Sequence, residues 1–207
     1  MAAPAVTRVR GFEPLAAPHA RVLVLGSMPG VASLRQQQYY AHPRNAFWPI
    51  AAAVFGFDAA AAYAPRVAAL TAAGVALWDV LQACERPGSL DADIDPATAE
   101  PNDFDTFFRA HPGIERVCFN GGKAAALFRR RVLPHSARAR RLQYVDLPST
   151  SPAHAAMSPR AKLAAWRQAL DTARGPGSPD CQGQRGQGSS GGSSSAISAS
   201  PARSRRS

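Results

Sequence analysis

The chain has 207 residues, 46% of them hydrophobic, which is enough for one domain with a buried core and excludes a multidomain machine. Lysine and arginine number 24 against 14 acidic residues, giving +10 at pH 7, and every one of those cations except Lys123 and Lys162 is an arginine. This excess favours a polyanionic partner such as nucleic acid, although a coding bias toward arginine and alanine would produce it too.

Cysteine usage and hydropathy exclude several further classes. Cys84, Cys118 and Cys181 lie far apart and form no CxxC pair, so the sequence predicts neither a zinc ribbon nor a disulfide scaffold. No run approaches the roughly 18 apolar residues of a membrane span, and charged residues interrupt the N-terminus where a signal peptide has its apolar core. We therefore expect a cytoplasmic protein with no membrane association, no metal and no cofactor.

The sequence divides into three segments. Residues 1–19 are interpreted as an N-terminal extension and residues 20–173 as the folded domain. From residue 174 onward Gly, Ser, Pro and Gln dominate and arginines recur near the end. A segment of that composition buries too little apolar surface to offset its ordering entropy, so we expect residues 174–207 to be a disordered tail.

Within the folded segment, short apolar runs alternate with helical patterns. The runs predict strands at 21–25, 75–79, 115–120 and 143–147, and the intervening patterns predict helices at 46–55, 65–73, 104–110, 122–131 and 158–173. Near-continuous apolar strands alternating with helices indicate an α/β fold, with a mainly parallel four-stranded sheet flanked by helices on both faces.

Ligand sites in such folds lie beyond the carboxyl ends of the strands. The segments that follow the four predicted strands are rich in glycine and small polar residues. They are 26–30, 80–84, 120–123 and 148–152. We expect all four to converge on one cleft.

The first of these segments and the stretch that follows it carry a family resemblance. The loop GSMPG at 26–30 and the run QYYAHPRNAFW at 38–48 resemble the uracil-DNA glycosylase superfamily, most closely its branch that removes hypoxanthine from DNA. The likeness continues through WDVL at 78–81, GSLD at 88–91, Asn120-Gly121 and LPSTSPA at 147–153. It covers roughly residues 20 to 170 and implies a three-layer sandwich built on a four-stranded parallel sheet.

The resemblance implies a role for Asn45, which stands at the asparagine of the AHPxN run. Cleavage of an N-glycosidic bond develops positive charge on the sugar and negative charge on the departing base, so the site must orient a water and stabilise an anion. Met28 can do neither, and Asn45 is therefore the predicted catalytic residue. Asparagine is also a preferred helix cap, which is the structural alternative. His42 and Arg44 are possible further site residues.

Base binding is expected from the first loop and two further side chains. The resemblance places Tyr40 as the platform on which the flipped base stacks, and Asn120 as the reader of the base edge. Gly26, Ser27 and Met28 are predicted to line the same pocket. The alternatives are that both Tyr39 and Tyr40 belong to the core and that Asn120 forms an ordinary Asn-Gly turn.

DNA-backbone contacts are expected from Pro29 and Gly30 of the first loop and from the fourth loop, Ser149, Thr150, Ser151 and Pro152, unless the latter is a plain connector. Leu147 occupies the position of a catalytic histidine in the best-known uracil branch, which argues against efficient uracil excision. His154 and Lys123 are possible site residues, with surface positions as the alternative. An arginine cluster at 129–131, 138 and 140–141 is interpreted as a phosphate-contacting or a merely solvated surface.

The sequence thus predicts a monofunctional DNA glycosylase. Its expected substrate is DNA with a deaminated base, chiefly hypoxanthine, and the expected assembly is a monomer. Because the two lysines offer no evident Schiff-base nucleophile, simple hydrolysis is expected. The alternatives are a uracil or G·T mismatch glycosylase, a catalytically silent DNA-damage binder, and a cleft for a small nucleobase metabolite.

Overall fold

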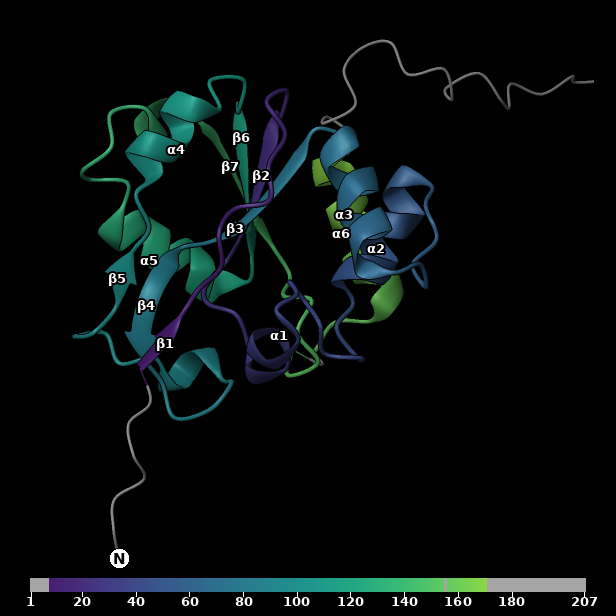
Figure 1. Ribbon diagram of the computed structural model, residues 1–207, viewed down its shortest axis with the longest axis horizontal. Coiled ribbons are helices and arrows are strands. Elements are labelled where there is room, and N and C mark those ends of the chain that lie inside the picture. Colours follow the sequence, from purple (N-terminus) through teal and green to yellow (C-terminus); the bar gives the residue numbers. More distant parts are fainter. Residues whose placement is uncertain (1–7, 155, 171–207) are drawn as a thin grey trace, which may run out of the picture. The chain divides into compact units, whose positions relative to one another are not determined.

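A parallel four-stranded sheet lies at the centre of the computed structural model, which describes residues 8–154 and 156–170 (Figure 1). Its strands are β2 (Val22–Gly26), β3 (Val75–Asp79), β6 (Arg116–Asn120) and β7 (Gln143–Leu147). They stand in the order β3-β2-β6-β7 and every neighbouring pair is parallel. The four predicted strands are confirmed, with β2 shifted by one residue toward the C-terminus and β6 starting one residue later than expected.

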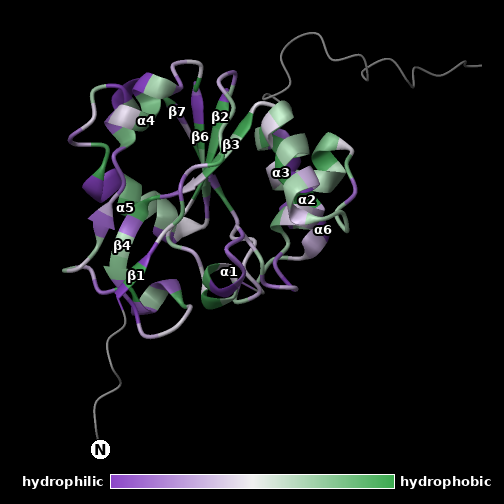
Figure 2. Ribbon diagram, viewed as in Figure 1, coloured by the Kyte–Doolittle hydropathy of each residue, from purple (hydrophilic) through white to green (hydrophobic). Residues whose placement is uncertain are grey.

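Helices cover both faces of this sheet. Along β2 successive side chains alternate between the faces. Val22 and Val24 join a core with α2 (Phe47–Phe55), α3 (Tyr63–Ala72) and α6 (Pro159–Leu170). Leu23 and Leu25 join a second core with α4 (Phe104–Ala110) and α5 (Gly122–Arg131). In Figure 2 the hydrophobic colours are strongest on β3, which stands between the two helical layers. The three-layer α/β prediction is confirmed.

A second, antiparallel sheet was not expected from the sequence. It has the order β1-β4-β5, formed by β1 (Arg8–Arg10), β4 (Leu81–Glu85) and β5 (Glu100–Pro101). The expectation that residues 80–84 form a cleft loop is wrong, because the chain continues from β3 almost directly into β4. Within the expected N-terminal extension, Arg8 to Arg10 form β1 and pair with β4.

Several shorter elements complete the described chain. Helix α1 (Val31–Gln36), absent from the sequence prediction, follows the loop after β2, and single 3₁₀ turns occur at Asp91–Asp93 and Ala139–Arg141. In the described ranges no helix is long and apolar enough to cross a bilayer. The end of the predicted last helix, 171–173, and the predicted tail, 174–207, lie outside the described residues.

Candidate active site

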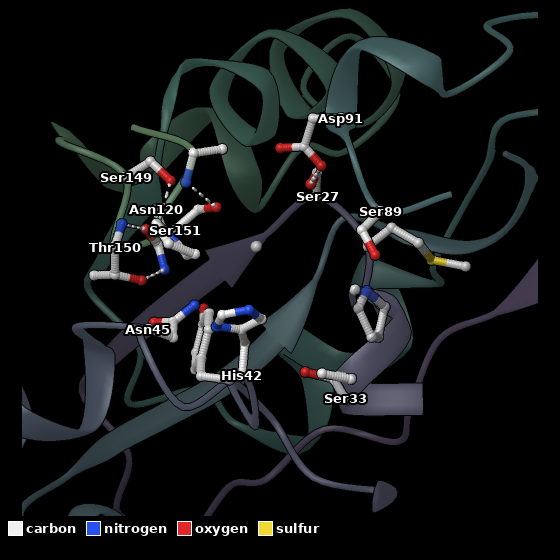
Figure 3. A pocket seen from close by; sticks show the side chains of 18 of the residues that line it. Ser27, Ser33, His42, Asn45, Ser89, Asp91, Asn120, Ser149, Thr150 and Ser151 are labelled. Carbon is white, nitrogen blue, oxygen red and sulfur yellow. Dashed lines mark hydrogen bonds between the residues drawn. The ribbon is translucent and has the colours of Figure 1, made fainter. Parts of the chain in front are cut away.

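A cavity of about 510 Å³ opens at the carboxyl ends of the parallel strands (Figure 3). Most of the site residues predicted from the sequence line this cavity. They are Gly26, Ser27, Met28, Pro29, Gly30, Tyr40, His42, Asn45, Asn120, Ser149, Thr150, Ser151, Pro152 and His154. Its size is that of an ordinary small-molecule pocket. Three of the four strand-end segments therefore converge as expected.

Asp79 is a pocket residue that sequence reasoning did not single out. It ends β3 directly beside Gly26 of β2 and is only 3% exposed. Its Oδ2 atom is buried without a hydrogen-bond partner among the described residues. Burial, reinforced by the negative charge of Asp91, raises the pKa of Asp79 to about 8. A largely neutral carboxyl group therefore lies in the pocket near pH 7.

The Asp79 carboxyl explains why the neighbouring residue is a glycine. A Cβ atom added to Gly26 would lie 2.3 Å from Asp79 Oδ1, which is closer than any real contact. The sequence signal for this pair was the WDVL run, whose aspartate falls in register with the first glycine of GSMPG. Sequence alone did not show that the two residues touch.

Tyr40 stacks within the site and Tyr39 belongs to the core. The Tyr40 ring stacks on Phe47 with centroids 4.1 Å apart, and its backbone adopts the left-handed conformation with φ 55°. Its buried hydroxyl has no hydrogen-bonding partner among the described residues, and burial raises its pKa. Tyr39 is 3% exposed and donates its hydroxyl hydrogen to the carbonyl of Glu13. Both tyrosines line the cavity, but Tyr39 is almost completely buried in the core.

Asn45 caps a turn and lines the pocket at the same time. Its Oδ1 accepts a hydrogen bond from the Phe47 backbone N–H at 2.9 Å, at the start of α2. The backbone N–H of Asn45 donates to the His42 carbonyl. The N-cap of α2 is Ala46, so the alternative that Asn45 is the helix cap is wrong, and its side chain closes a turn just before the helix. This turn uses the amide oxygen, and the described contacts leave the Nδ2 hydrogens available to the cavity.

His42 is oriented by the same turn. Its Nδ1 accepts a hydrogen bond from the Arg44 backbone N–H at 3.1 Å. A neutral imidazole whose Nδ1 accepts carries its proton on Nε2. In that form His42 presents an N–H donor, and the ring lies beside Asn45 at the pocket wall (Figure 3).

Asn120 joins the end of β6 to the fourth loop. Its Nδ2 donates to Thr150 Oγ1 and its Oδ1 accepts from the Thr150 backbone N–H, both at 2.8 Å. The Thr150 carbonyl in turn accepts from the Ala46 backbone N–H. One amide hydrogen and one oxygen lone pair of Asn120 remain for a ligand.

The opposite wall holds three further residues that were not predicted as site residues. Ser89, Leu90 and Asp91 line the cavity. Ser27 Oγ donates to Asp91 Oδ1 at 2.5 Å, and the Val31 N–H donates to Ser89 Oγ at 3.0 Å. The GSLD run at 88–91 was the available signal, and these contacts show why it accompanies GSMPG.

Two proposed site residues lie outside the cavity lining. Arg44 is exposed and Lys123 is partly exposed, and neither lines the pocket. Lys162, the other lysine, is 7% exposed and donates its Nζ hydrogen to the His154 carbonyl. Neither lysine is therefore placed to attack a ligand in the cavity.

The predicted arginine surface is also separate from the pocket. Arg129 forms an ion pair with Asp146 at 2.7 Å, and Arg138 donates to the carbonyls of Pro112 and Ile114. None of the six arginines of the cluster lines the cavity. Among the described residues, no group of three or more His, Cys, Asp and Glu side chains is arranged to hold a metal ion.

These features define a class: a three-layer α/β protein with a polar, amide-rich cavity beyond the ends of its parallel strands. The model of the Uracil DNA glycosylase superfamily matches residues 13–172, and the chain belongs to that superfamily. The GSMPG and AHPRN runs both lie within the matched residues.

Known relatives agree with this assignment. A protein of Methanosarcina acetivorans named hypoxanthine DNA glycosylase is 35% identical over 141 residues, which cover 64% of this chain and 88% of the relative. One of Methanosarcina barkeri with the same name is 37% identical over 56% of this chain and 72% of the relative. The solution NMR structure of a candidate uracil DNA glycosylase from M. acetivorans has a TM-score of 0.66 and 32% identity, covering 80% of this chain and 99% of that one.

Proposed function

We propose that this protein excises a deaminated base from DNA, chiefly hypoxanthine from deoxyinosine, by hydrolysis of the N-glycosidic bond. The observation that carries the proposal is the cavity in which Asn45 and Asn120 stand with the Tyr40 ring. Membership of the superfamily and the names of the two Methanosarcina relatives support it. DNA containing the damaged base is the implied partner.

The reaction needs stabilisation of two charges that develop together. The C1′–N9 bond breaks with its electron pair going to the base, and a water oxygen bonds to C1′ as a proton is released. The free Nδ2 hydrogens of Asn45 can hold the attacking water or the departing base, because its oxygen is already bonded to the Phe47 N–H. The neutral form of His42 offers a second N–H donor at the same wall.

The pocket can hold the base in two ways, by stacking against its face and by hydrogen bonds to its edge. Stacking on Tyr40, which is itself backed by Phe47, suits any flipped base. The remaining donor and acceptor of Asn120 and the carboxyl of Asp79 can bond to O6, N1–H or N7 of hypoxanthine. Ser149, Ser151 and Pro152, with Pro29 and Gly30 of the first loop, are proposed to contact the DNA backbone. The exposed Arg44, outside the cavity lining, and His154, which lines the cavity, are proposed to contact phosphates.

The test is base release from matched duplexes that carry one deoxyinosine, deoxyuridine, deoxyxanthosine or G·T mismatch, read by alkaline strand cleavage. We expect cleavage chiefly at deoxyinosine. Cleavage chiefly at uracil or at the mismatched thymine would replace the substrate assignment and keep the reaction. Silence on all four with tight binding to one would favour a damage-binding protein instead.

Two substitutions separate the roles of Asn45. Asp, like Asn, carries a side-chain oxygen at this position, so Asn45→Asp keeps an acceptor for the Phe47 N–H and removes the amide donor. We expect Asn45→Asp and Asn45→Ala both to lower base release by about 100-fold, the typical effect of losing a transition-state donor. Only Asn45→Ala should also lower thermal stability. Unaltered release by Asn45→Ala would contradict the mechanism.

We further propose that the enzyme is monofunctional and acts as a monomer in the cytoplasm. Neither lysine lines the cavity, which supports hydrolysis without a covalent intermediate. One cavity is enough to take up one flipped base from a linear substrate, so the reaction requires no second copy of the chain. Borohydride trapping on deoxyinosine DNA tests the monofunctional mechanism and should yield no covalent adduct. Light scattering tests the monomer, and imaging of the tagged protein in cells tests the cytoplasmic location.

A further inference from the structure

Part of the arginine cluster lies at the end of the domain opposite the cavity. Arg130 is in the last turn of α5, and Arg140 and Arg141 are in the 3₁₀ turn that precedes β7. The cavity residues 149–154 follow the other end of β7, and the five residues of this strand rise roughly 16 Å. In Figure 1, α1, which contributes to the cavity, lies below the sheet, and α4 lies beside its upper end.

The charge of this cluster is not cancelled by its surroundings. Segment 129–141 contains six arginines and no Asp or Glu. Among the described residues only Arg129 of these six forms an ion pair, with Asp146. In the same described contacts, one further carboxylate bonds to the segment, that of Asp105 on α4, which accepts from Ser136 Oγ. A concentration of positive charge therefore remains at this end of the domain.

The backbone that carries these arginines is fixed to the rest of the domain. Ala139 is fully buried, and its N–H donates to Ser136 Oγ. Arg138 donates to two backbone carbonyls of segment 112–114, which leads into β6. The two arginines that follow Ala139 therefore extend from an anchored turn.

Three unpaired arginines of the cluster are exposed. They are Arg130, Arg140 and Arg141. Arg140 donates to the Pro134 carbonyl at 3.3 Å, and the side chains of the other two make no hydrogen bond or ion pair with the described residues. A guanidinium group presents a planar fork of N–H donors that fits phosphate oxygens. No lysine or arginine lines the cavity, so this surface offers phosphate contacts that the cavity walls do not.

We propose that Arg130, Arg140 and Arg141 form a second DNA-binding surface, which holds the phosphate backbone of a duplex segment other than the one at the cavity. Duplex DNA has a persistence length of about 150 base pairs, so a duplex seated at the cavity does not bend around one small domain at low cost. The inference goes beyond the proposed function and does not depend on which base is released. Contacts to phosphates carry no sequence information, so this surface retains the protein on any DNA.

The test is capture of a second duplex by the full chain. Protein is bound to beads that carry one undamaged duplex, and a fluorescent duplex of the same sequence is then added at low salt. Arg130→Gln with Arg141→Gln removes two of the three cations. The matched control, Arg10→Gln with Arg167→Gln, makes the same charge change at exposed arginines of β1 and α6. We expect the wild type and the control to capture the fluorescent duplex and the first variant to capture at least about tenfold less.

Two further measurements sharpen this comparison. The slope of log capture affinity against log salt should become shallower by about 2 in the first variant, because each lost phosphate contact removes about 0.9. Single-turnover base release from a short deoxyinosine duplex at saturating protein should stay within about twofold of the wild type, because the cavity is unaltered. The four substituted arginines are exposed, so the variants should fold normally, and thermal unfolding checks this.

Several results would overturn the proposal. They are undiminished capture by the first variant, an equal loss in the control, a parallel loss of single-turnover release, and capture that light scattering traces to a protein dimer. Binding of polyglutamate by the wild type in place of a second duplex would assign the surface to an acidic protein. Base release without capture would reject this inference alone, and capture without base release would reject the proposed function alone.

Discussion

Asn120 and Thr150 are joined by two hydrogen bonds of 2.8 Å that run in opposite directions, one from each residue to the other. The pair connects the end of β6 to the loop after β7 and holds the Asn120 amide in one orientation. Its oxygen and nitrogen are each anchored by Thr150, so the remaining donor and acceptor face a ligand in a defined order. An amide free to rotate by half a turn would exchange them.

Thr150→Val tests this anchoring. Valine matches threonine in shape and keeps the backbone N–H bond but removes the Oγ1 acceptor. We expect stability to fall by about 1 kcal/mol and base release to fall about fivefold, as one net hydrogen bond is lost at a buried site. Thr150→Ser keeps the hydroxyl and should be the more active variant. The reverse order of activity would show that packing of the methyl group matters more than the bond.

Substitutions of Tyr40 distinguish its ring from its hydroxyl. Tyr40→Phe removes a buried hydroxyl that has no hydrogen-bond partner in the described residues, so we expect unchanged or slightly higher stability. Base release should stay within about threefold if the ring is the contact, whereas Tyr40→Ala should lose at least about tenfold because stacking is removed. Steady-state release from deoxyinosine duplexes measures both. A large loss in Tyr40→Phe would assign the hydroxyl to the base edge.

Asp79→Asn should change how stability depends on pH. The folded pKa of Asp79, about 8, lies above the ordinary aspartate value of about 3.9. The neutral carboxyl therefore contributes stability that is fully present below about pH 4 and is lost as the pH rises through about 8. The variant has no charge to bury, so its advantage over the wild type should grow across this window, by up to about 1.4 kcal/mol per pH unit where the folded state is protonated and the unfolded state is ionised.

Urea unfolding of Asp79→Asn and the wild type at pH 5, 7 and 9 measures that difference. We expect the variant to be the more stable protein at pH 9, with a smaller gap at pH 5. Parallel curves over the whole range would show that Asp79 is not the titrating group.

Gly26→Ala should be destabilising because the new methyl group would lie 2.3 Å from Asp79 Oδ1. Overpacking of this kind costs about 1–3 kcal/mol. Adding Asp79→Ala should recover part of that loss, which a double-mutant cycle measures as coupling. Gly122→Ala is the matched control, since nothing lies within 4 Å of a Cβ there and the residue begins α5. Additive effects of the Gly26 and Asp79 changes would contradict the contact.

The fold and most of the cavity-lining residues could be predicted from the sequence, because the signals for them lie in short runs of neighbouring residues. A buried parallel strand needs a nearly continuous apolar run, and such a run ended by a glycine or an asparagine is visible at Val22–Gly26 and at Arg116–Asn120. Strand ends of one parallel sheet meet at one edge, which places Gly26 and Asn120 at a common site. The resemblance of the AHPRN run to the family then predicted that Asn45 and His42 belong to the site.

Tertiary structure alone decided the rest. The residues after β3 continue into β4 and pair with β1, a contact between segments far apart in the chain that periodicity cannot reveal. The segment between β4 and β5 then brings Leu90 to the wall of the cavity. Tertiary packing also leaves Asp79 buried beside Gly26 with a raised pKa, because desolvation depends on everything packed around a group and not on its neighbours in sequence.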